Sequence, residues 1–232
     1  MIAPSIPRSP PPTIVALAGQ KGGAGKSTLA VCLAVEAMTR GQRVLLVDAD
    51  PQGTARTWAE VSAEAGHPTP TTISMGAAMH RNGQLWKLSE GYDLTLVDCP
   101  PRHGEIQRAA LMCADRVLIP CGPSAPEVWS LGDTTTLLAE ARALRPELAA
   151  TVVLTKVQPR TAVGAGAAAA VEGAGLPVAD VRLGFRVAYQ EALVCGRGVT
   201  THDPTGAAAR EVRRLYDELF GQAPRARGGR RG

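Results

Sequence analysis

Residues 19–28 decide the fold, and they read Gly19-Gln20-Lys21-Gly22-Gly23-Ala24-Gly25-Lys26-Ser27-Thr28. This stretch follows the apolar run TIVALA (13–18) and opens residues 26–40, which read as a helix ended by Gly41. Glycines let backbone N–H groups turn inward and surround a phosphate without a clash from side chains. The start of the helix adds its dipole. The sequence therefore predicts a phosphate-binding loop between a strand and a helix.

Two side chains of this loop suit a nucleotide with Mg²⁺. Lys26 is expected to bridge the β- and γ-phosphates, and the Ser27 hydroxyl is expected to reach the metal. The spacing departs from the common G-x-x-x-x-G-K-[ST] pattern, because five residues separate Gly19 from Gly25. The chain has four lysines, and two of them, Lys21 and Lys26, lie here. A compact ammonium at a phosphate explains that placement better than a plain glycine-rich turn does.

Apolar runs alternate with helical stretches over the rest of the chain. Strands are expected at 13–18, 44–48, 94–98, 117–120, 151–155 and 178–183, and helices at 54–65, 104–114, 126–145, 161–174 and 205–220. Residues 66–90 are expected to form a loop with a short strand. Strands that are apolar on both faces and alternate with helices indicate an α/β fold. We predict a mainly parallel sheet with helices on both faces, of the P-loop NTPase type.

The length suits one α/β domain of ordinary size or two very small ones, and the composition indicates a core of aliphatic side chains. The 232 residues are 45% hydrophobic, 20% charged and 3% aromatic. We expect a single domain at 13–220, between a flexible proline-rich leader (1–12) and a disordered Arg/Gly-rich tail (221–232). Few aromatic side chains argue against binding single-stranded nucleic acid by base stacking. Four arginines of the tail account for the net charge of +4, and they are Arg225, Arg227, Arg230 and Arg231.

Three aspartates at the ends of apolar runs are candidates for metal binding and hydrolysis. Asp48 and Asp50 lie in Val47-Asp48-Ala49-Asp50-Pro51-Gln52-Gly53, and Asp98 lies in Leu96-Val97-Asp98-Cys99-Pro100-Pro101. At the carboxyl edge of a parallel sheet, one carboxylate could hold Mg²⁺ through water and another could orient the attacking water. The alternative stays open that Asp48 or Asp50 caps the helix near Thr54, and that Asp98 is an ordinary strand-end aspartate.

These motifs together resemble the ParA/MinD superfamily. Lys21–Thr28 resembles its deviant Walker A motif, 47–53 its second motif and 96–101 its Walker B segment, and the resemblance covers roughly residues 13–220. It is closest to compact plasmid-type ParA partition ATPases. The chain departs from the family at Thr155, where an asparagine near the base is common.

The resemblance implies roles for particular residues. ATP would be held by Gly22, Gly23, Ala24, Gly25, Lys26, Ser27 and Thr28, and Mg²⁺ by Ser27, Asp48 and Asp98. Lys21 would reach the phosphates of the opposite subunit in a nucleotide-sandwich homodimer. Asp50 would be needed for hydrolysis.

The resemblance also implies a cycle of DNA binding. The ATP dimer would bind DNA without sequence preference, and a ParB-like centromere-binding partner would stimulate hydrolysis and release. Basic residues that could contact DNA phosphates include Arg182, Arg186, Arg197, Arg210, Arg213 and Arg214. Several of these could instead form a solvated helix face, because Glu211, Asp217 and Glu218 are interspersed.

Two other functions remain open on the sequence. One is a ParA-like ATPase that positions a protein assembly, and the other is a MinD-like membrane-associated regulator. The second needs an amphipathic helix at the C-terminus, and bulky apolar residues are missing after Phe220. Five cysteines without a C-x-x-C pair, and no apolar run of about 18 residues, favour a cytoplasmic protein without a membrane partner. The resemblance to ParA proteins implies that it is associated with the nucleoid.

Overall fold

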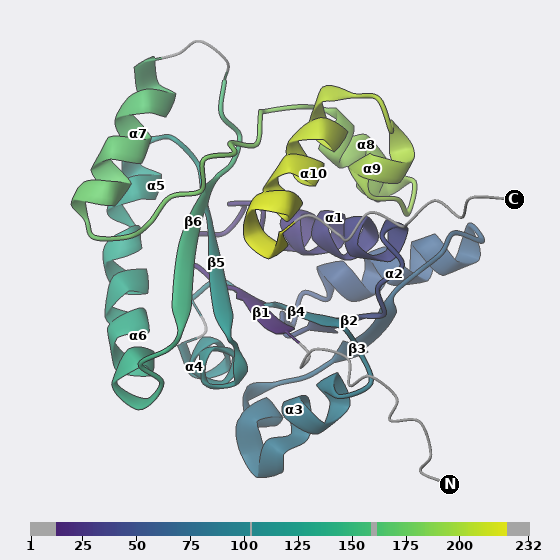
Figure 1. Cartoon of the computed structure of the whole chain (residues 1–232), viewed down its shortest axis with the longest axis horizontal. Helices are drawn as coiled ribbons and strands as arrows, with labels where there is room; N and C mark the ends of the chain where they lie inside the picture. Colours follow the sequence, from purple (N-terminus) through teal and green to yellow (C-terminus); the bar gives the residue numbers. More distant parts are fainter. Residues whose placement is uncertain (1–12, 103, 159–161, 222–232) are drawn as a thin grey trace, which may run out of the picture.

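The computed structural model describes residues 13–102, 104–158 and 162–221 (Figure 1). The expected leader (1–12) and nearly all of the expected tail lie outside the described residues. Within that part of the chain, no helix is both long enough and apolar enough to cross a membrane.

A parallel sheet forms the centre of the molecule. Its six strands within the described residues are β1 (Thr13–Leu17), β2 (Val44–Asp48), β3 (Thr71–Ser74), β4 (Leu94–Asp98), β5 (Arg116–Cys121) and β6 (Ala149–Leu154). They lie in the order β3-β2-β4-β1-β5-β6, and every neighbouring pair is parallel. Asp98 is opposite both Leu17 and Asp48 in the register. The carboxyl ends of the three strands predicted to carry the site therefore meet at one edge.

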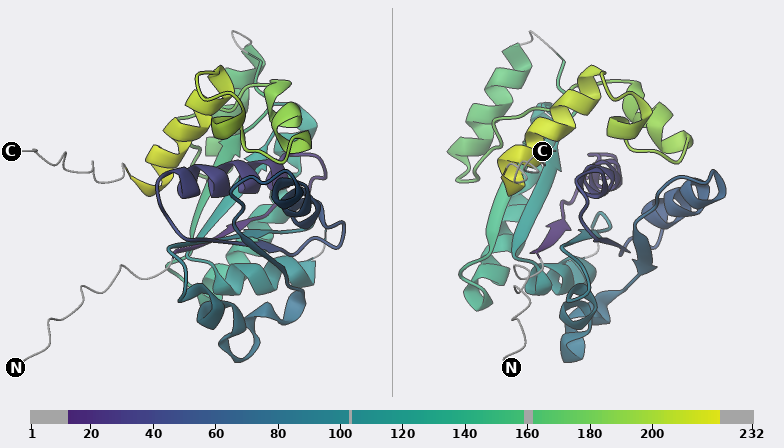
Figure 2. Two further views of the ribbon diagram at one scale, coloured as in Figure 1. Left: turned by 90° about the vertical axis from the view of Figure 1, so that its right-hand side faces the viewer. Right: turned by 45° about the vertical axis from the view of Figure 1, so that its right-hand side comes forward.

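Helices cover both faces of this sheet, which confirms the predicted fold class. One face packs against α1 (Lys26–Thr39), α2 (Thr54–Glu64), α8 (Ala188–Val194), α9 (Val199–His202) and α10 (Ala207–Phe220). The other face packs against the 3₁₀ segment η1 (Ala77–Gly83), α3 (Gln84–Ser89), α4 (Gly104–Cys113), α6 (Leu131–Leu144) and α7 (Ala162–Gly173). Figures 1 and 2 show the two groups on opposite sides of the strands.

The structure corrects three secondary-structure predictions. Residues 178–183 form no continuous strand. Val178 makes an isolated parallel bridge to Val152 of β6, and the N–H groups of Ala179 and Leu183 donate to the Val152 and Leu154 carbonyls. Between these contacts, the N–H groups of Asp180 and Val181 donate instead to the Glu218 carboxylate of α10 at 2.7 and 3.0 Å. The helix expected at 126–145 is broken at Ser130 into α5 (Ala125–Trp129) and α6; the Ser130 hydroxyl donates back to the Glu127 carbonyl at 2.6 Å. The segment 66–90 contains η1 and α3 as well as the expected short strand, β3.

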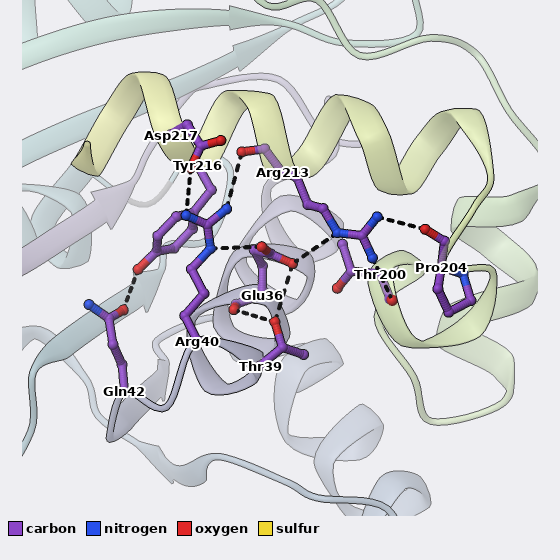
Figure 3. A network of polar contacts seen from close by, with 9 residues as sticks. All are labelled: Glu36, Thr39, Arg40, Gln42, Thr200, Pro204, Arg213, Tyr216 and Asp217. Carbon is purple, nitrogen blue, oxygen red and sulfur yellow. Dashed lines mark hydrogen bonds and ion pairs between the residues drawn. The ribbon is translucent and has the colours of Figure 1, made fainter. Parts of the chain in front are cut away.

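A buried carboxylate links the end of α1 to α10 (Figure 3). Glu36 is 3% exposed, and its Oε1 accepts a hydrogen bond from Arg40 Nε at 2.8 Å. Arg40 Nη1 also pairs with Asp217 of α10 at 2.5 Å, and Arg213 Nε lies 3.9 Å from Glu36 Oε2. A buried carboxylate needs such partners, since an unpaired one is strongly unfavourable. The helix that begins at the phosphate loop is thereby held against α10.

Candidate nucleotide-binding site

A cavity of about 460 Å³ opens at the carboxyl edge of the sheet. Five segments line it, and they are 22–29, 50–54 in part, Pro101, 155–156 and 183–190 in part. This volume is in the range of small-molecule sites. The predicted phosphate loop forms one wall, and the loop after β6 and the segment before α8 form the facing parts.

The phosphate loop leaves open space where a ligand could approach its backbone. A Cβ added to Gly22 or Gly23 would meet no atom within 4 Å. Gly23 and Gly25 have φ values of 73° and 98°, which a residue with a side chain rarely adopts. The loop therefore has the shape that phosphate binding by backbone N–H groups requires.

Lys26 lies under this loop at the start of α1. Its side chain is 6% exposed, and its Nζ donates to the Lys21 carbonyl at 3.0 Å. Burial lowers the pKa of Lys26, while Asp98 and Asp50 raise it. A buried ammonium beside two carboxylates is poised to exchange the Lys21 carbonyl for a phosphate oxygen.

Asp98 offers two buried oxygens to a cation. It is fully buried, and neither carboxylate oxygen has a hydrogen-bond partner among the described residues. Burial raises the pKa of Asp98 to about 7, opposed by the nearby Ser27 hydroxyl and the Lys26 ammonium. An oxygen donor set of this kind, completed by phosphates and waters, is what Mg²⁺ prefers. Ser27 and Asp98 therefore fit the predicted metal position.

Asp48 and Asp50 differ in their surroundings. Asp48 is buried, and its two oxygens accept the N–H groups of Asp50 at 3.1 Å and Arg56 at 2.8 Å. Asp48 thus holds the loop between β2 and α2 and the start of α2. Asp50 is half-buried, lines the cavity and accepts the Gln52 N–H at 2.9 Å. The cavity therefore faces Asp50, and the predicted metal role of Asp48 stays a prediction.

Lys21 lies apart from these residues. Its side chain is exposed, does not line the cavity, and makes no hydrogen bond or ion pair within the described part of the chain. Two lysines of one loop therefore have opposite environments: Lys26 is directed into its own site, and Lys21 is accessible from outside.

Comparison with known proteins agrees with this geometry. The family model described as CobQ/CobB/MinD/ParA nucleotide binding domain matches residues 15–197. The chain belongs to this family.

Two relatives illustrate the breadth of the ParA/MinD group. The chain is 33% identical to the maintenance of carboxysome distribution protein A of Halothiobacillus neapolitanus, over 89% of this chain and 95% of the relative. It is 32% identical to the chromosome-partitioning ATPase Soj of Thermus thermophilus, over 91% and 97%. Both relatives are matched over almost their whole length.

Solved structures share the fold. An ATP complex of a Cyanothece McdA variant superposes with a TM-score of 0.76 at 19% identity, covering 92% of this chain and 98% of that one. The cell division ATPase MinD of Pyrococcus furiosus gives 0.72 at 19% identity, covering 89% and 98%. At this identity the likeness concerns the fold alone.

This ParA/MinD-family site also contains residues to which the sequence interpretation gave no role at the loop, although it noted Thr155 as a departure from the family pattern. Lys156 Nζ donates to the Gly23 carbonyl at 2.5 Å, and Thr155 Oγ1 donates to the Ala24 carbonyl at 2.9 Å. Gln107 is fully buried and donates to the Gly19 and Pro100 carbonyls at 3.4 and 2.7 Å. The scarcity of lysine in this chain was the one sequence feature that could have drawn attention to Lys156.

Three of the six arginines proposed for DNA contact, namely Arg182, Arg186 and Arg197, fall into two groups. Arg186 lines the cavity and pairs with Glu211 at 2.5 Å, and Arg197 Nε donates to His67 Nε2 at 3.1 Å. Arg182 is exposed and makes no ion pair within the described residues. The three candidates therefore differ in how freely they could meet a phosphate.

Replacing Asp98 by asparagine should change how the stability of the ligand-free protein depends on pH. The folded pKa of Asp98 is raised from 3.8 to about 7, so its proton stabilises the fold below about pH 4. That contribution is lost as the pH rises through about 7. We expect the melting temperature to fall more steeply from pH 5 to pH 8 in wild type than in Asp98→Asn. The measurement is made without nucleotide or Mg²⁺. If the melting temperatures of wild type and Asp98→Asn change equally with pH, the raised pKa is contradicted.

Proposed function

We propose that the chain is an ATP-dependent partition ATPase. It binds ATP with Mg²⁺, dimerises, binds DNA without sequence preference, and leaves DNA when a ParB-like partner stimulates hydrolysis. The observation that carries this proposal is the phosphate loop with one buried lysine, Lys26, and one exposed lysine, Lys21. The matched family and the Soj relative support it.

The chain's own groups divide the work of hydrolysis. N–H groups of the loop and the Lys26 ammonium hold the polyphosphate and withdraw charge from it. The Ser27 hydroxyl and Asp98 would hold Mg²⁺, and the bound ion would supply positive charge against the charge that develops on the phosphate oxygens. The Asp50 carboxylate, in the cavity wall, orients the attacking water and accepts its proton. Asp48 keeps Asp50 in place through the Asp50 N–H.

A direct test is the rate of phosphate release from ATP, measured with the protein alone, with duplex DNA, and with DNA plus a candidate ParB-like partner. The candidate partner is the protein encoded by the gene next to that of this chain. We expect slow hydrolysis that rises only when both are present. A rate that stays at background under all three conditions would contradict the proposed activity.

Lys21→Ala should remove dimerisation that depends on ATP. The Lys21 ammonium is exposed and unpaired within the described residues, so it is available to the nucleotide of a second subunit. We expect light scattering to give a dimer mass for wild type with ATP and a monomer mass for Lys21→Ala. Lys87→Ala, on an exposed lysine of α3, is the control and should dimerise as wild type does. A variant dimer at the same ATP concentration would exclude this role for Lys21.

Hydrogen bonds between α10 and residues 180–184, beside the cavity, support a surface for DNA phosphates. Glu211 accepts the Gly184 N–H at 3.0 Å, and Glu218 accepts the N–H groups of Asp180 and Val181. Arg214 lies between the two glutamates at helical spacing, and therefore on the same side of α10. Arg182 lies within residues 180–184, the segment that these hydrogen bonds hold against α10. Both arginines are exposed and make no ion pair among the described residues.

We expect the double variant Arg182→Ala/Arg214→Ala to weaken DNA binding equally for all sequences. Each phosphate contact contributes about 0.9 to the slope of log affinity against log salt concentration. Loss of two contacts should flatten that slope by roughly two units per subunit. The control is Arg81→Ala, an exposed arginine of η1 on the other sheet face. An unchanged slope, measured with duplex DNA and the ATP dimer, would move the DNA surface elsewhere.

A second candidate function is supported by the carboxysome-distribution relatives. An ATPase that positions a protein assembly would use the same nucleotide cycle and the same DNA surface. The two candidates differ in the partner that stimulates hydrolysis. Stimulation by a centromere-binding protein favours partition, and stimulation by a protein that binds an assembly favours positioning. Binding to lipid vesicles in place of DNA would favour a MinD-like regulator.

A further inference from the structure

Two neighbouring side chains hold the phosphate loop from outside. Lys156 Nζ donates to the Gly23 carbonyl at 2.5 Å, and the buried Thr155 hydroxyl donates to the next carbonyl, that of Ala24, at 2.9 Å. Both residues directly follow β6, and both line the cavity beside the loop. They are more than 130 positions from their partners, so the contact is made by the tertiary fold.

These contacts bear on the direction of the loop's backbone dipoles. A phosphate is bound by N–H groups, and a carbonyl that turned toward it would repel it. Each carbonyl that accepts a hydrogen bond from Thr155 or Lys156 is held toward β6. Gly23 is conformationally free, with a φ of 73° and open space around it, so its peptide group needs such a restraint.

The backbone of Lys156 adds an independent observation. Its φ is 54°, a left-handed conformation that residues other than glycine, asparagine and aspartate seldom adopt. Such a conformation persists only where the surroundings impose it, and it is frequent at ligand sites. The next residue, Val157, is fixed by its N–H to the Leu183 carbonyl at 3.0 Å. The strained backbone directs the Lys156 side chain back across the loop.

We propose that Thr155 and Lys156 are positioning residues that preorganise the phosphate loop for polyphosphate. They act through the Gly23 and Ala24 carbonyls, and the nucleoside is not their target. The inference rests on the proposed binding of ATP. The two lysines that donate to loop carbonyls then respond differently when nucleotide binds. Lys26 replaces its hydrogen bond to the Lys21 carbonyl with one to a phosphate, whereas Lys156 retains its hydrogen bond to the Gly23 carbonyl.

Titration calorimetry with two probes tests this role. The probes are ATP and inorganic tripolyphosphate, each with Mg²⁺, because the second has the phosphates without the nucleoside. We expect Lys156→Met to weaken both about tenfold to a hundredfold, as for a lost hydrogen bond from a charged donor. Thr155→Val should weaken both about threefold to tenfold. Lys156→Arg and Thr155→Ser keep a donor and should recover most of the affinity.

Matched controls separate this role from a loss of folding. Lys87→Met changes an exposed lysine of α3 and should bind both probes as wild type does. Lys156→Gly accepts the left-handed backbone without strain but lacks the ammonium. It should melt no lower than wild type without ligand, yet bind both probes as weakly as Lys156→Met.

Three outcomes would overturn the inference. A loss confined to ATP would assign Lys156 to the nucleoside, and affinities equal to wild type would remove any role in binding. If wild type binds neither probe, the proposed nucleotide function fails and the inference fails with it. If wild type binds both probes and Lys156→Met binds them equally well, the inference is wrong while the proposed nucleotide function stands.

Discussion

Replacing Lys26 by alanine should reduce the affinity for ATP by more than about a hundredfold, the loss expected when a buried charge partner is truncated. The Lys26 ammonium is buried at the start of α1, and in the ligand-free protein it donates to the Lys21 carbonyl at 3.0 Å. Its charge is opposed by burial and supported by Asp98 and Asp50. Nucleotide phosphates would complete this partly compensated site, and alanine cannot hold them.

The same variant should still fold without ligand. Burial lowers the pKa of Lys26, so removing the ammonium relieves a desolvation cost, and it also takes away the cation that opposes the raised pKa of Asp98. The two effects act in opposite directions on stability. Fluorescent-nucleotide titration and a melting curve on the same sample give both readouts. Lys87→Ala is the matched control. Equal ATP affinity in Lys26→Ala and wild type would exclude the phosphate-loop assignment.

Replacing Asp50 by alanine should leave ATP binding within a few-fold of wild type and slow hydrolysis by about a hundredfold or more. General-base groups contribute factors of about 10² to 10⁴ to rates. Asp50 lines the cavity, and its carboxylate holds one backbone N–H, that of Gln52. Removing it therefore costs catalysis more than structure. The ATP-bound variant should accumulate on duplex DNA, because release follows hydrolysis in the proposed cycle.

Two further variants sharpen the role of Asp50. Asp50→Asn keeps the size and a hydrogen-bond acceptor, so it should fold like wild type and hydrolyse ATP as slowly as Asp50→Ala. Asp48→Ala removes the acceptor for the N–H groups of Asp50 and Arg56 and should lower the melting temperature as well. Unchanged phosphate release in Asp50→Ala would assign the water-orienting role to Asp48 instead.

The sequence by itself determined the architecture and the position of the glycine-rich loop between β1 and α1. Short apolar runs that alternate with helical stretches are typical of strands in a covered parallel sheet, and such runs are visible residue by residue. Glycines at Gly23 and Gly25 are needed locally, since their left-handed backbone is excluded for most other residues. Asp98 ends such a run and Asp50 lies two residues after another, so the sequence alone placed both near the carboxyl edge of the sheet. These signals depend on neighbours within a few positions.

Only the tertiary structure decided which polar groups are paired. Glu218 accepts the N–H groups of Asp180 and Val181, so residues 178–183 pair with β6 only at scattered positions and form no continuous strand. Gly23 follows β1 and Lys156 follows β6, and the strand order β1-β5-β6 brings the ends of these two strands close enough for the Lys156–Gly23 hydrogen bond. No local sequence pattern specifies this strand order. Burial gives Asp98 its raised pKa. Hydrogen bonds and desolvation depend on distance in space, and the partners here lie tens to more than a hundred residues apart in the chain.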